Sequence, residues 1–187
     1  MFSMTKTKTI LGLSLAAVFA VSMLGSAYAA GHVVIVTTEL EAEDLEISEV
    51  KIVVAADIPT NGGAGAFGYG IFTDGTNNVL ALTTHAGIDD HSSQEGGAGP
   101  IFHAHVLDLF LPPISTNCGG FTAEVDFAGS GANAGFDADY EVSVKGKKIT
   151  VEDIDMSEIS EGVESIKAFT LTPIGPNLCL TVISEQP

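Results

Sequence analysis

The chain has 187 residues, 45% of them hydrophobic, and a formal net charge of −17 at pH 7. Its 24 acidic residues are opposed by seven lysines and no arginine, which excludes nucleic-acid binding because such binding relies on Lys and Arg contacts to phosphate. An anionic membrane surface would repel the same charge, whereas metal cations would be attracted to it. The acidity is equally consistent with adaptation to a salty habitat.

The first 29 residues predict a cleaved signal peptide. Lys6 and Lys8 form a short basic start, residues 10–24 are apolar and uncharged, and an Ala-Tyr-Ala tripeptide ending at Ala29 matches a cleavage site. The apolar stretch is shorter than the roughly 20 residues of a membrane-spanning helix. We therefore expect a mature chain of residues 30–187 that is secreted or held outside the cytoplasm, in a periplasm or at a cell surface.

Cleavage after Ala29 would make Ala30-Gly31-His32 the new N-terminus. A free amine, two backbone amides and an imidazole at the third position can surround Cu(II) or Ni(II) in a square plane. His32 is therefore a candidate copper ligand. The alternative is that His32 only precedes an exposed strand and binds nothing.

From Gly31 onward, short apolar or alternating runs are separated by Gly, Asp, Asn and Pro, which is typical of β-strands. Residues 39–46 are expected to form an acidic connector and residues 155–161 a short helical turn, while Asp74-Gly75 predicts a hairpin turn. Strands are expected at residues 32–38, 50–54, 67–72, 79–84, 102–110, 121–127, 140–145, 148–151, 166–172 and 177–184. The pattern predicts an all-β fold, a single-domain antiparallel β-sandwich or barrel-like sandwich of about nine to ten strands.

Four of the five histidines fall within residues 79–110, where an apolar run, a polar loop and a second apolar run predict a hairpin. His103 and His105 are two residues apart, so on a strand both side chains point to the same face. His85 ends the preceding run and is expected near His103, and His91 lies in the loop between the strands. Three or four imidazoles favour a zinc or copper ion over magnesium or calcium. We therefore predict a metal site at these four histidines.

Two considerations oppose this hypothesis. His85 falls in step with Val79, Ala81 and Thr83, so a bulge or the strand end is needed to turn it toward the other histidines. A histidine bonded to a backbone carbonyl is also common in protein cores. The clustering of four histidines in one hairpin favours a metal site over this alternative.

The two cysteines, Cys118 and Cys179, lie in the predicted mature chain, where an even count favours a disulfide. A metal-bound thiolate is the alternative, but no His or Met lies near Cys179 in the sequence. A bridge across about 60 residues would stabilise the fold by roughly 4 kcal/mol in the chain-entropy model.

The segment Ile101-Phe102-His103-Ala104-His105 resembles the Phe-His-x-His strand of copper/zinc superoxide dismutases. Those enzymes are β-sandwiches with a disulfide that reaches the C-terminal strand, so the resemblance implies metal ligands at His103 and His105. It covers five residues and the two cysteines. The further histidines and the arginine that those enzymes use downstream are absent, so we assign no family.

Three functions remain open. The first is an exported β-sandwich that carries or buffers copper or zinc through its histidines. The second is a structural or adhesive subunit of the cell surface whose histidines are incidental. The third is a metalloenzyme with an open position at the metal, for which the sequence singles out no catalytic residue.

Overall fold

The computed structural model describes residues 31–43, 46–73, 79–85, 88, 102–111, 117–130, 140–154 and 163–186. The predicted signal peptide, the Asp74-Gly75 turn, the helical turn expected at 155–161 and His91 lie outside these residues. Among the described residues, no helix has the length and apolar character needed to cross a membrane.

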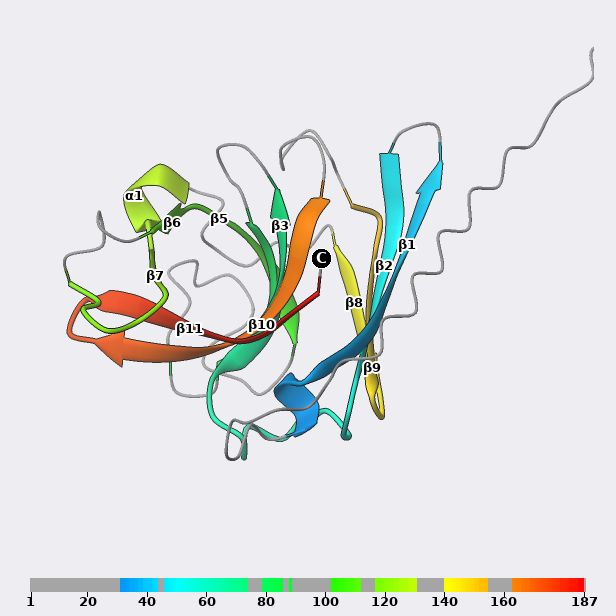
Figure 1. Ribbon diagram of the computed structural model, residues 1–187, viewed down its shortest axis with the longest axis horizontal. Coiled ribbons are helices and arrows are strands. Elements are labelled where there is room, and N and C mark those ends of the chain that lie inside the picture. The colour runs from blue at the N-terminus through cyan, green and yellow to red at the C-terminus, as the bar shows by residue number, and fades with distance from the viewer. Residues whose placement is uncertain are drawn as a thin grey trace, which may run out of the picture.

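The described chain is almost entirely β-structure and forms two antiparallel sheets (Figure 1), which confirms the predicted sandwich class. One sheet has four strands in the order β1-β2-β9-β8, and the other has seven in the order β5-β4-β3-β10-β11-β7-β6. The strands are β1 (Ile35–Glu43), β2 (Glu46–Val54), β3 (Phe67–Thr73), β4 (Val79–Thr84), β5 (His103–Leu107), β6 (Leu109–Phe110), β7 (Ala123–Val125), β8 (Glu141–Lys145), β9 (Lys148–Glu152), β10 (Val163–Ile174) and β11 (Asn177–Gln186). Two short helices, η1 (Gly31–Val33) and α1 (Phe127–Ser130), complete the described elements.

Most predicted strands are present, but the acidic connector expected at residues 39–46 is wrong. These residues belong mainly to β1 and the start of β2, which pair as an antiparallel hairpin. Glu41 lies directly opposite Glu49, and the Lys51 ammonium contacts both carboxylates. This lysine offsets the repulsion between the two facing carboxylates, so a strongly acidic segment can form an exposed strand.

The strand predicted at residues 121–127 is shorter than expected, because it begins at Ala123 and ends at Val125. The Asp126 carboxylate accepts hydrogen bonds from the backbone N–H groups of Ala128 and Gly129, at 3.0 and 2.8 Å, and so caps α1. Asparagine and aspartate are favoured at this position because they satisfy the unpaired N–H groups of a first helical turn. Phe127 therefore lies in α1 rather than in the strand.

One face of the larger sheet packs against the four-stranded sheet and forms the main core. From the larger sheet this core takes alternate residues of β3, β4 and β5, among them Tyr69, Leu82 and Ala104. From the smaller sheet it takes residues such as Ile52 and Ile149, both fully buried. Because side chains alternate between the two faces along each strand, the remaining side chains of these strands lie on the opposite face of the larger sheet, outside the main core.

The larger sheet curls until its two edges come together. β5 and β6 lie at opposite ends of its strand order, yet only Asp108 separates them in sequence. The Asp108 amide donates to Ser130 Oγ at 2.8 Å, and its carbonyl accepts from the Asp126 amide at 2.9 Å. The chain thus passes directly from one edge to the other, and the concave face encloses a second apolar cluster. That cluster comprises Val79, Ala81, Leu107, Ala123, Val125, Phe169 and Leu180, with further partly buried residues around it.

Two glycines of β3 make room for a ring inside the curl. A Cβ atom at Gly68 would lie 2.5 Å from the Leu82 carbonyl oxygen and 3.1 Å from the Phe169 ring. One at Gly70 would lie 3.3 Å from the same ring. Phe169 can pack over β3 only because these positions carry no side chain, and a glycine within a strand often marks such a close approach.

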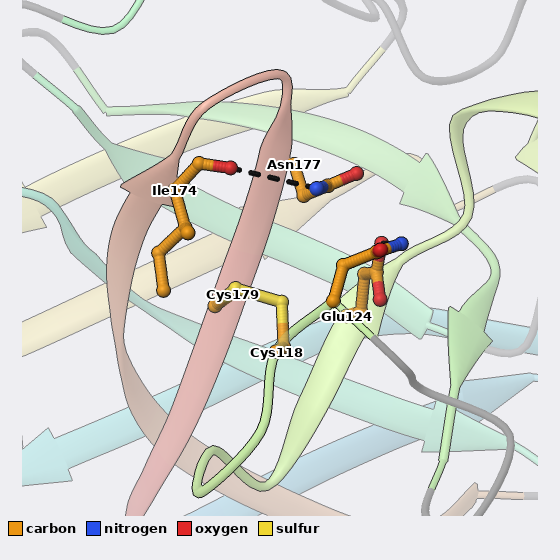
Figure 2. Close-up of a disulfide and its surroundings, with 6 residues drawn as sticks. Cys118, Glu124, Ile174, Asn177 and Cys179 are labelled. Carbon is orange, nitrogen blue, oxygen red and sulfur yellow. Dashed lines mark hydrogen bonds between the residues drawn. A yellow bond between two sulfur atoms is a disulfide. The ribbon is translucent and has the colours of Figure 1, made fainter.

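The predicted disulfide is present between Cys118 and Cys179, with a Cα–Cα distance of 5.5 Å. It joins the segment before β7 to β11, as Figure 2 shows. Glu124 lies beside it on β7 and pairs with Cys179 across the two strands. This buried carboxylate accepts a hydrogen bond from the Asn117 amide at 3.0 Å.

Candidate metal centre

Strand register brings the histidines of β4 and β5 to one face. β4 and β5 pair antiparallel, with Thr83 opposite His103 and Ala81 opposite His105. Directly opposed residues point to the same side of a sheet, so the odd-numbered residues of both strands share the concave face. His85 directly follows the end of β4 in the same alternation, and it reaches that face without a bulge between β4 and β5.

The three imidazoles converge at their Nε2 atoms. His85 Nε2 lies 2.8 Å from His103 Nε2 and 3.3 Å from His105 Nε2. The ring centroids of His103 and His105 are 4.6 Å apart. All three side chains are buried, with at most 7% of any residue exposed. These rings form a compact buried group at one end of the curled sheet.

The backbone holds His85 in one orientation. Its Nδ1 atom lies 3.0 Å from the Ile88 carbonyl oxygen, which can only accept, so Nδ1 carries the proton. In the neutral imidazole, Nε2 then presents a lone pair toward the other two rings. Metal-bound histidines are held in this way, with the second ring nitrogen donating to a carbonyl or carboxylate.

The spacing of the nitrogens suits a small divalent cation. A ligand atom from each of His85, His103 and His105 lies within 4.8 Å of the other two. A tetrahedral ion with bonds of about 2.0–2.1 Å to nitrogen sets its ligands about 3.3 Å apart. A single proton can bridge only two of these nitrogens, whereas one cation can satisfy all three.

Among the described residues of β4 and β5 on this face, the triad is accompanied by apolar side chains and one hydroxyl. Val79, Ala81 and Leu107 share its face of the sheet. Thr83 also lies on this face, is only 2% exposed, and its Oγ1 has no hydrogen-bond partner within the described structure. From the sequence, Thr83 is only one member of the strand's alternation, because a threonine within an apolar strand gives no sign that its hydroxyl will be unpaired.

Two other predicted ligands are not placed at this group by the described residues. His91 lies outside the described residues, so its part in the site stays a prediction. His32 lies in η1, where its ring packs against Phe67 with centroids 4.6 Å apart, and burial lowers the pKa of this imidazole. Its carbonyl accepts a hydrogen bond of 2.5 Å from the Tyr69 hydroxyl. The N-terminal copper site also stays a prediction, because Ala30 is not among the described residues.

No protein-family model matches the chain, and no curated protein or solved structure is detectably similar to it. The chemistry of the site therefore has to be argued from its own residues.

Proposed function

We propose that this protein is exported from the cytoplasm and binds one zinc or copper ion through His85, His103 and His105, for metal carriage or buffering. The observation that carries the proposal is the convergence of three buried Nε2 atoms, one of them oriented by a backbone carbonyl. Imidazole ligands favour these two metals over magnesium or calcium. His91, in the loop between the two strands, is proposed to fold over the site.

Two further observations support a role outside the cytoplasm. The Cys118–Cys179 disulfide is typical of proteins from oxidising compartments. The chain has 24 acidic residues and only seven lysines, and the resulting negative potential draws cations toward the protein surface before they reach the buried site. Both fit a protein that collects a metal ion from dilute solution.

Zinc titration is the direct test, because a square-planar N-terminal site suits copper and nickel but not zinc. The chain beginning at Ala30 is stripped with a chelator, loaded with zinc, and analysed for metal content and for affinity by competition. We expect one zinc per chain, and a loss of more than about 100-fold in affinity for His85→Ala, His103→Ala and His105→Ala. Removing a residue that only hydrogen-bonds to a metal ligand typically lowers metal affinity by about 10–100-fold, so a larger loss indicates that the histidine binds the metal itself.

His32→Ala is the matched control, since it removes a histidine that lies outside the triad. It should keep zinc binding and lose only a second copper ion, if the N-terminal site exists. Unchanged zinc stoichiometry in both His103→Ala and His105→Ala, with circular dichroism showing intact folds, would refute the proposal. Metal-independent filament assembly would then favour a structural subunit.

A further inference from the structure

A cavity of about 150 Å³ lies within the curl of the larger sheet, directly beside the histidine triad. His85, His105 and Thr83 contribute to its wall, and so do apolar side chains from the strands on both sides of the curl. The apolar part includes Leu107, Val125, Phe169, Leu171, Leu178 and Leu180. The described residues facing the space are therefore mostly hydrocarbon, apart from the small polar group beside the metal site and Asn177 at the start of β11.

The opposite part of the cavity reaches the surface. Pro173 near the end of β10 and Gly175 and Pro176 of the β10–β11 turn belong to its wall, and all three are exposed. The turn of this long hairpin, orange to red in Figure 1, lies at the end of the molecule away from the four-stranded sheet. A small molecule can therefore enter beside the turn and reach the histidines through an apolar space.

The triad leaves a place for a ligand from this space. Three histidines supply three of the four bonds of a tetrahedral ion, and catalytic or ligand-binding sites of this kind keep the fourth position open. Two of the three, His85 and His105, line the cavity, so an ion held by them would border it. Thr83 lies on the same wall, and its hydroxyl, which has no partner among the described residues, gains a hydrogen bond from a ligand there.

Size and polarity restrict the occupant. An apolar cavity of about this volume holds a single benzene-sized molecule. None of the described residues that line the cavity is a lysine, aspartate or glutamate. A charged group on the bound molecule would lose its hydration in the cavity without gaining an oppositely charged partner. The part of the molecule that fills the cavity therefore has to be uncharged and apolar.

We infer that the cavity binds a small, mostly apolar molecule, about the size of one aromatic ring plus a donor group. Its nitrogen or oxygen donor atom occupies the fourth position on the metal ion, and a second polar atom of the donor group, such as an N–H, hydrogen-bonds to the Thr83 hydroxyl. This inference rests on the proposed metal site and adds the class of ligand that the site accepts.

The test uses the protein loaded with cobalt(II) in place of zinc, because the visible spectrum of cobalt reports a change in its ligands. The probes are imidazole, which carries the donor alone, and 4-phenylimidazole, which adds the ring. We expect both to change the spectrum, and 4-phenylimidazole to bind at least about tenfold more tightly because its ring leaves water. Toluene is expected to compete with the ring without changing the spectrum itself.

Two pairs of variants separate the cavity from the metal. Leu178→Trp fills the cavity from β11 and should abolish the advantage of the phenyl group, while Ile183→Trp, on the same strand and outside the cavity, should preserve it. Thr83→Val should weaken both probes by about tenfold. Thr73→Val removes another buried, unpartnered hydroxyl outside the cavity wall and should change neither affinity.

The outcomes distinguish the two proposals. A protein that binds no cobalt or zinc would overturn the metal site and this inference together. A protein that binds the metal, but shows no preference for 4-phenylimidazole or keeps the preference in Leu178→Trp, would overturn the inference and leave metal carriage standing.

Discussion

At the scale of single residues, some polar groups buried in apolar surroundings have a hydrogen-bond partner and others have none within the described structure. Tyr69 is fully buried, but its hydroxyl donates to the His32 carbonyl and so connects β3 to η1. Thr83 is equally buried and has no such partner in the described structure. A ligand that enters a cavity beside such a buried, unpaired group can supply the missing hydrogen bond. That hydrogen bond then contributes to the free energy of ligand binding.

The buried phenol of Tyr69 predicts how stability responds to alkali. Burial raises the pKa of Tyr69 well above its ordinary value near 10. Below pH 10 both the folded and unfolded states hold the proton, so this residue adds no pH dependence there. Above pH 10 the unfolded chain loses the proton while the folded protein keeps it, so the free energy of unfolding falls by up to about 1.4 kcal/mol per pH unit.

The variant Tyr69→Phe should lack this contribution to the alkaline slope. At neutral pH it should be less stable by about 1 kcal/mol, because the His32 carbonyl loses its donor. Urea unfolding at pH 8, 10 and 11 measures both effects. Parallel pH profiles for the wild type and the variant would contradict the prediction.

At the scale of elements, the curl depends on strands that are too short to hold it alone. β6 has two residues and β7 has three, and β7 pairs with β11 through only two positions. The Cys118–Cys179 disulfide holds this edge to β11 covalently. The same edge supplies Leu109 and Val125 to the cavity wall, so the disulfide helps to keep the cavity closed.

Removal of the disulfide should therefore loosen this edge before the rest of the molecule. The double variant Cys118→Ala/Cys179→Ala should lose about 4 kcal/mol of stability, as the chain-entropy model gives for a sequence separation of 61. In hydrogen exchange, the amides of Ala123 and Val125 should lose protection, while those of Ile52 and Ile149 in the four-stranded sheet should remain protected. Uniform loss of protection in both sheets would show that the disulfide stabilises the fold without any special effect on this edge.

At the scale of the whole molecule, alternation within strands was enough to predict the sandwich and the histidine hairpin. It identified β8 and β9 closely and placed His103 and His105 on one face. It could not give the register between β4 and β5, which decides whether His85 joins them, because register depends on contacts between strands.

Two other features also depend on distant contacts. The acidic second part of β1, residues 39–43, was missed because its pairing with β2 and Lys51 makes it stable, and its own acidic residues do not indicate a strand. The closure at Asp108 places β5 and β6 at opposite edges of one curled sheet, although the sequence predicts a single continuous strand. The cavity follows from that closure, so it has no signature in the local sequence.

Because the triad connects β4 to β5 at the edge of the curled sheet, metal binding should stabilise the whole fold. A ligand that binds only the folded state adds about 2.7 kcal/mol at a free concentration 100 times its dissociation constant. For a domain of this size that corresponds to an increase of about 5–10 °C in the melting temperature. We expect this increase with zinc in the wild-type protein and its absence in His103→Ala and His105→Ala, as measured by calorimetry.

Magnesium at the same ionic strength is the control for the acidic surface. If zinc acted only by screening the 24 acidic side chains, magnesium would raise the melting temperature equally, and the histidine variants would respond like the wild type. Oxygen-preferring magnesium has little affinity for three imidazoles, so a response to zinc alone attributes the stabilisation to the triad. An equal response to both ions would instead assign the cation dependence to the acidic surface.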